Sequence, residues 1–164
     1  MDRYIGKHAQ PVRDAIDDQT AAYIIEARRQ FENLRQVSAQ LAGLMVLAAA
    51  GSQSAGPHHP MLESAARLHE ETRDAVARAC VPRRARRHHL FLLAAAESLA
   101  GALRAAESGI ALDPVLVPLR AAYAQLQQAS KELPGFPMVA FEQGCCGAKE
   151  ATRERSLTVA GLKL

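Results

Sequence analysis

Two adjacent cysteines between glycines are the residues of this sequence best suited to chemistry. Cys145 and Cys146 stand between Gly144 and Gly147. Neighbouring thiolates can bind a soft metal, form a strained disulfide, or act as a nucleophile and its resolving partner. Guanidinium or imidazolium groups close by would lower the pKa of either thiol. The pair is therefore a candidate for metal binding or thiol redox, while inert cysteines acting as small hydrophobic side chains are the simpler interpretation.

One more cysteine and two histidines are the candidate partners of this pair. Cys80 precedes a Val-Pro step, and His88 and His89 follow it. Cys80 and one of these histidines would complete, with Cys145 and Cys146, a tetrahedral site of three sulfurs and one nitrogen. No CxxC spacing accompanies the set. The sequence thus offers these five residues as a candidate site for zinc or another thiophilic metal, serving a sensor, a carrier or a metalloenzyme.

Four arginines, Arg83, Arg84, Arg86 and Arg87, form the second candidate site. Cations at the start of a helix oppose its macrodipole, and each exposed one costs about 0.3 to 1 kcal/mol. An anionic ligand, an acidic partner, nucleic-acid phosphate or carboxylates elsewhere in the fold would offset that cost. A solvated basic turn is the plain alternative. Nucleic acid is disfavoured because no aromatic residues interleave the run.

The sequence contains no recognisable catalytic constellation. Residues 144–149 do not match a phosphate-binding loop, because two residues rather than four separate the glycines and Ala148 displaces Lys149. The serines lack a nucleophile elbow, and every acidic residue has a plausible place on a solvated helix face. Glu97 follows three alanines, and we expect it to face outward beside Arg104. These features favour a non-enzymatic protein.

Composition narrows the structural class. The chain has 164 residues, of which 49% are hydrophobic and only 4% aromatic, and its net charge is +3. Few aromatic residues and many alanines disfavour sheets. The longest apolar stretches, 41–50 and 90–96, are shorter than the roughly 20 residues of a membrane span. The first seven residues lack the apolar region of a secretory signal, so we expect a cytoplasmic protein without a membrane segment.

Glycines and prolines divide the chain into four predicted helices. The first occupies residues 11–50 and would be roughly 60 Å long if unbroken, so a break near Asp17 and Asp18 or a homodimer that uses the surplus length is expected. Its inward residues repeat every seven positions. They are Ile24, Phe31, Ser38 and Met45 in one phase, and Ala27, Leu34, Leu41 and Ala48 in the other.

The other three helices follow from local start and stop signals. The second runs from Pro60 to about Cys80, and the third ends at Ser108 and Gly109. The fourth takes Asp113 as its N-cap and Pro114 as its first residue, or begins at Pro118, and it ends at Pro134 and Gly135. The predicted inward residues of the second helix are Leu62, Ala65, Leu68, Ala75 and Ala79, with His69 at an edge. Those of the fourth are Leu116, Leu119, Tyr123, Leu126 and Leu133.

Short connections between helices imply antiparallel neighbours. We therefore expect an all-α single domain: an antiparallel four-helix bundle over residues 1–133, with a partly irregular C-terminal appendage over 134–164. A reversal at Val81 and Pro82 would place Cys80, residues 83–89 and the start of the appendage at one end. His58 and His59 would lie roughly 30 Å away.

The leading functional hypothesis is a non-enzymatic, cytoplasmic helical-bundle protein. It would bind a protein partner or a small anionic ligand at the end that bears residues 83–89 and the cysteine pair, and it would form a homodimer. The first alternative is the metal or thiol-redox protein described above. The second is a nucleic-acid-associated regulator that uses the four arginines.

Overall fold

The computed structural model describes residues 16–52, 56–109 and 112–138, which contain helices and loops but no strand. The four α-helices are α1 (Asp18–Ala49), α2 (Pro60–Arg78), α3 (Arg86–Glu107) and α4 (Leu112–Glu132), and one 3-10 turn, η1 (Arg83–Ala85), precedes α3. The predicted all-α class and its four helices are confirmed. Cys145 and Cys146 lie outside the described residues.

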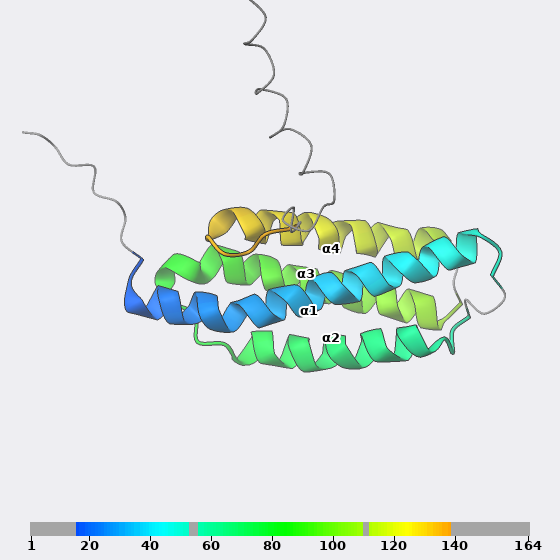
Figure 1. The fold of residues 1–164 in the computed structure, drawn as a ribbon, viewed down its shortest axis with the longest axis horizontal. Helices are drawn as coiled ribbons and strands as arrows, with labels where there is room; N and C mark the ends of the chain where they lie inside the picture. The colour runs from blue at the N-terminus through cyan, green and yellow to red at the C-terminus, as the bar shows by residue number, and fades with distance from the viewer. Residues whose placement is uncertain (1–15, 53–55, 110–111, 139–164) are drawn as a thin grey trace, which may run out of the picture.

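The four helices lie side by side along the longest axis of the molecule (Figure 1). In that view the chain runs from left to right in α1 and α3, and from right to left in α2 and α4. Helix α1 contacts each of the other three, and α3 packs most extensively against α4. The start of α1, the α2–α3 connection and the end of α4 therefore meet at one end. We call it the basic end, after Arg83, Arg84, Arg86 and Arg87.

Helix α1 begins at the break that the sequence predicts. Asp17 is its N-cap: Oδ1 accepts a hydrogen bond from the backbone N–H of Thr20 at 2.8 Å, and Oδ2 accepts one from the Thr20 hydroxyl at 2.9 Å. These hydrogen bonds lower the pKa of the Asp17 carboxyl. Such a cap satisfies a backbone donor that the first turn would otherwise leave without a partner.

The buried face of α1 is wider than the two predicted stripes. Of the eight stripe residues, only Ile24 and Ala48 are not fully buried. Four further residues, Thr20, Tyr23, Val37 and Leu44, are buried as well. Thr20 extends the phase of Ala27, and the other three share a third seven-residue phase beside that of Ile24. The apolar stripe of a helix that packs on several neighbours is wider than a two-position seam.

The inward face of α2 is more polar than predicted. Leu62, Ala65 and Val76 are buried, but His69 and Thr72 occupy the positions between them. His69 was expected at an edge, and this was wrong: its Nε2 lies 2.7 Å from the carbonyl oxygen of Ala96 in α3. A partner inside the protein removes most of the cost of burying a polar group. The predicted inward residues Leu68, Ala75 and Ala79 are only partly buried.

Thr72 connects α2 with α1. Its hydroxyl donates to the carbonyl oxygen of Leu68 at 2.7 Å and accepts from Nδ2 of Asn33 at 3.1 Å. The hydrogen-bond chain therefore runs from a side chain of α1, through a side chain of α2, to the backbone of α2. It holds the two helices together with directional contacts in addition to apolar packing.

Helix α4 starts earlier than predicted, and its predicted inward stripe is confirmed in part: Leu119, Leu126 and Leu133 are buried, and Leu116 is partly buried. The helix already includes Leu112, so Asp113 is not its N-cap, and Pro118 lies inside the helix rather than at its start. Tyr123 was expected inward but is 45% exposed. The buried residues of α4 alternate steps of four and three, the seven-residue repeat of helices that pack side by side. They are Val115, Leu119, Ala122, Leu126 and Ala129.

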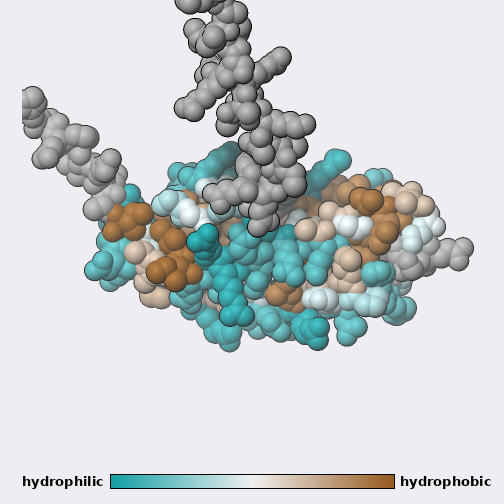
Figure 2. Space-filling model, in the orientation of Figure 1, coloured by the Kyte–Doolittle hydropathy of each residue, from teal (hydrophilic) through white to brown (hydrophobic). Residues whose placement is uncertain are grey.

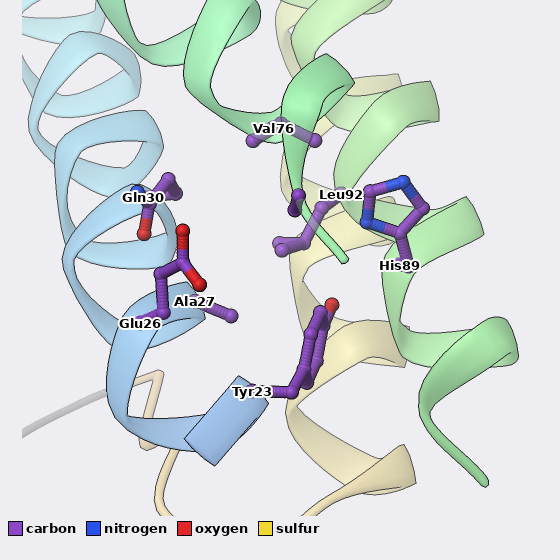
Figure 3. Close-up of a pocket in the computed structure, with 8 residues that line it drawn as sticks. Tyr23, Glu26, Ala27, Gln30, Val76, His89 and Leu92 are labelled. Atoms are coloured by element: carbon purple, nitrogen blue, oxygen red, sulfur yellow. The ribbon is translucent and has the colours of Figure 1, made fainter. Parts of the chain in front are cut away.

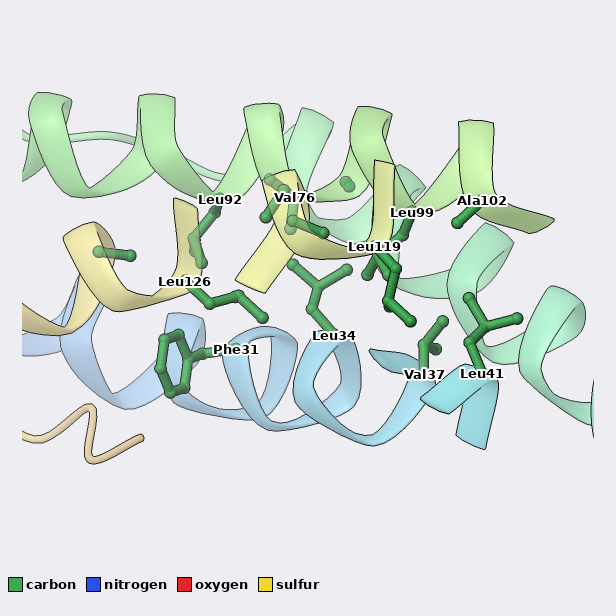
Figure 4. Close-up of a cluster of buried hydrophobic side chains, with 14 of the residues drawn as sticks. Phe31, Leu34, Val37, Leu41, Val76, Leu92, Leu99, Ala102, Leu119 and Leu126 are labelled. Carbon is green, nitrogen blue, oxygen red and sulfur yellow. The ribbon is translucent and has the colours of Figure 1, made fainter. Parts of the chain in front are cut away.

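Leucines from three helices fill the middle of the core. Figure 4 shows Leu34 and Leu41 of α1 opposite Leu99 of α3 and Leu119 of α4, and all but Leu119 are fully buried. Alanines occupy many of the remaining inward positions of α3 and α4. A small side chain at a helix contact lets the two backbones approach closely. This explains why these two helices share the largest contact.

The helical stretch Arg83–Glu107 has the length and hydropathy of a weak membrane-span candidate. However, 44% of its most apolar window is buried against the rest of the protein. A core helix of a soluble protein shows the same pattern, because apolar residues that face neighbouring helices raise the average hydropathy. We therefore assign this stretch to the core that the described residues form.

Candidate functional site

All four predicted ligand-binding arginines are exposed at the basic end. Two of them lie close to carboxylates of other helices. Nη2 of Arg87 is 3.1 Å from Oε1 of Glu132, at the end of α4. Arg84 contributes to the lowered pKa of Asp17, so it lies near the start of α1. Carboxylates elsewhere in the fold therefore offset part of the unfavourable charge at the start of α3, as one of the predicted explanations requires.

The other two arginines point into solvent. Among the described residues, neither Arg83 nor Arg86 has an ion-pair or hydrogen-bond partner. Arg83 begins η1 and Arg86 begins α3, and residues three positions apart are neighbours on a helical surface. Leu90, which follows Arg86 by one helical turn, is 62% exposed. The two cations and this leucine therefore form a strip along one side of α3, here called the Arg83–Leu90 strip.

No side chain caps the turn that leads into α3, and the backbone N–H of Ala85 donates to the carbonyl oxygen of Pro82 at 2.9 Å. Pro82 precedes η1 and Ala85 precedes α3, and neither makes a side-chain capping hydrogen bond. The first N–H groups of a helix have no partner within the helix, and together with the macrodipole they favour an anion. An acidic group near the Arg83–Leu90 strip would thus meet both guanidinium groups and backbone donors.

His88, which the sequence offers as a metal ligand, is fully buried beneath this turn. Its Nδ1 lies 2.9 Å from the hydroxyl oxygen of Tyr23, and the two groups share a hydrogen bond. The imidazole also stacks at a tilt on Phe136, with 4.1 Å between ring centroids. Its Nε2 is buried without a hydrogen-bond partner among the described residues. Burial, with a smaller effect from His89, lowers the pKa of His88 to about 4, so the ring is neutral at pH 7.

His89 lines a small pocket between α1, the end of α2 and the first turns of α3 (Figure 3). Glu26 and Gln30 of α1 lie on one side of it and His89 on the other, with Tyr23 between them. Nδ1 of His89 and Oε1 of Gln30 are buried without partners among the described residues. Burial lowers the pKa of His89. The free volume is about 10 Å³, which suits a single water molecule rather than an organic substrate.

The predicted metal set is only partly within the described residues. Cys80 is exposed, beside Ala79 of the pocket, and it lies at the same end as His88 and His89. In the described part of the chain no three His, Cys, Asp or Glu side chains are close enough to hold a metal ion. Because Cys145 and Cys146 lie outside that part, the zinc site stays a prediction. Elemental analysis of the protein and of a Cys145→Ser, Cys146→Ser variant would test it.

Two other sequence predictions concern residues away from the basic end. His59 caps α2: its Nδ1 accepts a hydrogen bond from the backbone N–H of Met61 at 3.1 Å. His58 is exposed, as expected of a loop residue. Glu97 faces solvent, 3.9 Å from Nη2 of Arg104, which confirms its predicted outward position. None of these residues forms a catalytic arrangement with another described side chain.

No sequence motif marks Tyr23 and Phe136 as partners of His88. Tyr23 is 65 positions from His88, so no local pattern joins the two rings. Tyr23 lies four positions before Ala27, and this helical spacing is compatible with an inward position on α1. Phe136 follows Gly135, whose φ of +93° ends the α4 segment and turns the chain back over the core. The pairing of these rings with His88 is therefore a product of tertiary structure.

Comparison with known proteins identifies no relative. No family model matches the chain, and no curated protein or solved structure is significantly similar to it.

Proposed function

We propose that this chain is a non-enzymatic, cytoplasmic helical-bundle protein that binds an acidic segment of a partner protein at its basic end. In this proposal the four helices form an antiparallel bundle that acts as a rigid support. Two observations favour such a bundle: successive helices run in opposite directions in Figure 1, and α1 packs on the other three. The support holds η1 and the first turn of α3 in place for binding.

The observation that carries the proposal is the pair of exposed arginines without partners. Arg83 and Arg86 stand at a helix start where no side chain caps the backbone donors. A carboxylate placed there would form charge-assisted hydrogen bonds, which are about twice as strong as neutral ones. Its negative charge would also offset the unfavourable electrostatic interaction between these cations and the helix dipole.

Leu90 favours a protein segment over a small anion. It exposes a large apolar side chain one turn beyond Arg86. A small anion would leave this leucine in water, whereas a peptide with an apolar residue beside its acidic ones would bury it. The nearby pocket is too small to admit an organic ligand. Nucleic acid is less well matched, because an apolar residue on the strip has no partner on a phosphate backbone.

Fluorescence anisotropy with a labelled peptide of alternating glutamate and leucine tests the proposal. We expect saturable binding to the full chain, and at least a tenfold weakening in an Arg83→Glu, Arg86→Glu variant. The matched control is Arg28→Glu, Arg29→Glu, which makes the same change in charge at two exposed positions of α1. Binding that weakens equally in both variants would show only a general charge effect and would contradict the proposed site.

Two further probes separate the alternatives. A peptide with glutamine in place of glutamate should lose binding, and Leu90→Ser should weaken binding of the glutamate peptide several-fold. A short DNA duplex serves as the nucleic-acid probe. If it binds more tightly than the peptide at 150 mM salt, and if the Arg83→Glu, Arg86→Glu variant loses this binding, the site is a nucleic-acid site and the present proposal is wrong.

A further inference from the structure

The last three turns of α1 are apolar on every side, yet half of their circumference faces solvent. Residues 41–50 contain only Leu, Ala, Gly, Met and Val. Leu41, Leu44 and Met45 are buried, whereas Val46 is 68% exposed and Leu47 is 37% exposed. A helix that is apolar all round is normally buried all round. The outer side of this segment is therefore a surface without its partner.

The start of α4 extends this surface. Leu112 is 41% exposed and Val117 is 70% exposed, although both belong to a helix with an ample buried face. Figure 2 shows hydrophobic side chains gathered over the end of α1 and the start of α4, at the right of the view, with hydrophilic residues over the middle of the molecule. We call Val46, Leu47, Leu112 and Val117 the apolar face.

The charge distribution indicates what covers this face. No Lys, Arg, Asp or Glu occurs between Arg35 and Glu63. A charged peptide or an anionic membrane would find no complementary group on α1 here. Two copies of the chain, each with a net charge of +3, repel one another over most of their surfaces. The α1 part of this face carries no charge, and the start of α4 adds one exposed carboxylate, Asp113, and one cation, Arg120, whose charges balance. The repulsion is therefore weakest here, so this face is the most favourable place for self-association.

The centre of the face has the shape that a contact between identical helices needs. Ala39, Gly43 and Val46 follow one another along the outer side of α1, at helical spacing. A methyl group added to Gly43 would meet nothing within 4 Å, so the surface there is open. In a twofold contact each surface meets its own copy, and Val46 of each copy can enter the space above Gly43 of the other.

We propose that the apolar face is the interface of a homodimer in which the C-terminal turns of α1 cross near Gly43. The face spans about three turns of one helix and two of another, less than the roughly 800 Å² per partner of a standard interface. The dimer is accordingly reversible, with dissociation in the micromolar range. It leaves the basic end free on both copies, so each dimer presents two Arg83–Leu90 strips.

Sedimentation equilibrium of the full chain from 1 to 200 µM tests this. We expect a monomer–dimer equilibrium, and a monomer throughout for Val46→Glu, whose charges would face one another across the twofold axis. The matched control is Ile25→Glu, because Ile25 is 78% exposed on the same helix near the basic end. This control should dimerise as the unmodified chain does, and circular dichroism should show equal helicity in both variants.

Sedimentation of an equimolar mixture of the Val46→Glu and Val46→Lys variants is the decisive experiment. Opposite charges across the axis should restore a dimer in the mixture, although Val46→Lys alone is also monomeric. A chain that is monomeric at 200 µM would overturn the proposal, as would equal losses for Val46→Glu and Ile25→Glu. If the mixture stays monomeric while the unmodified chain dimerises, the dimer uses another surface and the proposal fails.

Discussion

The two ends of this molecule are built from different kinds of side chain. The basic end combines four arginines on its surface with Tyr23, His88 and Phe136 inside, and within the described part of the chain Nε2 of His88 and Nδ1 of His89 are buried without partners. The middle of the core and the opposite end contain mainly Leu, Val, Ala and Met, with His69 and Thr72 buried among them. The apolar part supplies most of the stability through burial, whereas the basic end holds groups whose interactions depend on protonation and direction.

The largest effect is expected where leucines fill the middle of the core. Leu99→Ala should lower the free energy of unfolding by about 2 to 5 kcal/mol, because it removes buried methyl groups and leaves a cavity. Leu90→Ala, on the same helix but exposed, should change it by less than about 0.5 kcal/mol. Urea unfolding followed by circular dichroism measures both. Equal effects would mean that α3 does not bury the face that contains Leu99.

Lowering the pH should destabilise the protein, because it favours protonation of His88 at the basic end. The fold lowers the pKa of His88 from 6.5 to about 4, so it favours the neutral ring. Between these pH values the unfolded chain binds the proton more readily, and stability falls as the pH falls. The loss approaches about 3 kcal/mol near pH 4. A Tyr23→Phe, His88→Leu variant should not show this loss. The free energy of unfolding of each protein is measured at pH 7 and at pH 4.5, and the decrease in the unmodified chain minus the decrease in the variant gives the contribution of His88.

The hydrogen bond between Tyr23 and His88 should show strong coupling. Tyr23→Phe leaves a buried Nδ1 without a partner, and His88→Leu leaves a buried hydroxyl, so each should cost about 2 kcal/mol. The double variant removes both polar groups and should cost less than the sum of the single changes, by at least about 1 kcal/mol. Strict additivity would show that the two side chains do not interact.

Two glycines should respond in opposite directions at the two ends. Gly135, next to Phe136, has a φ of +93°, so Gly135→Ala should destabilise the protein by about 1 kcal/mol. Gly43 is helical and an added methyl group there meets nothing within 4 Å, so Gly43→Ala should stabilise the monomer by about 0.5 to 1 kcal/mol. Thermal unfolding at 2 µM measures both. Destabilisation by Gly43→Ala would mean that this side of α1 is already covered within one chain.

Much of the fold is predictable because local signals mark the ends of the helices. Asp17 caps the start of α1, Pro60 begins α2, and Gly109 and Gly135 follow α3 and α4. The burial pattern is harder to predict, because apolar character alone does not select the inward face of an alanine-rich helix. In α2 the buried face follows His69, whose partner lies on another helix.

The candidate site is less predictable than the fold. The exposure of the four arginines follows from residue type, and it was expected. His88 belongs to the same basic run, RRARRHH, and nothing in that run distinguishes a buried imidazole from an exposed one. Its burial depends on Tyr23 and Phe136, which come from opposite ends of the described chain. Contacts of such long sequence separation leave no periodic trace in a single sequence.

The hydrogen-bond chain from Asn33 through Thr72 to Leu68 has a consequence for the uniqueness of the native state. Alanine-rich surfaces offer few distinctive shapes, so two such helices can slip past each other by one turn and recover similar methyl contacts. A slipped α1 would leave the Thr72 hydroxyl without the Asn33 amide. This pair thus sets the register of α1 on α2, and it favours one alignment over neighbours of nearly equal packing energy.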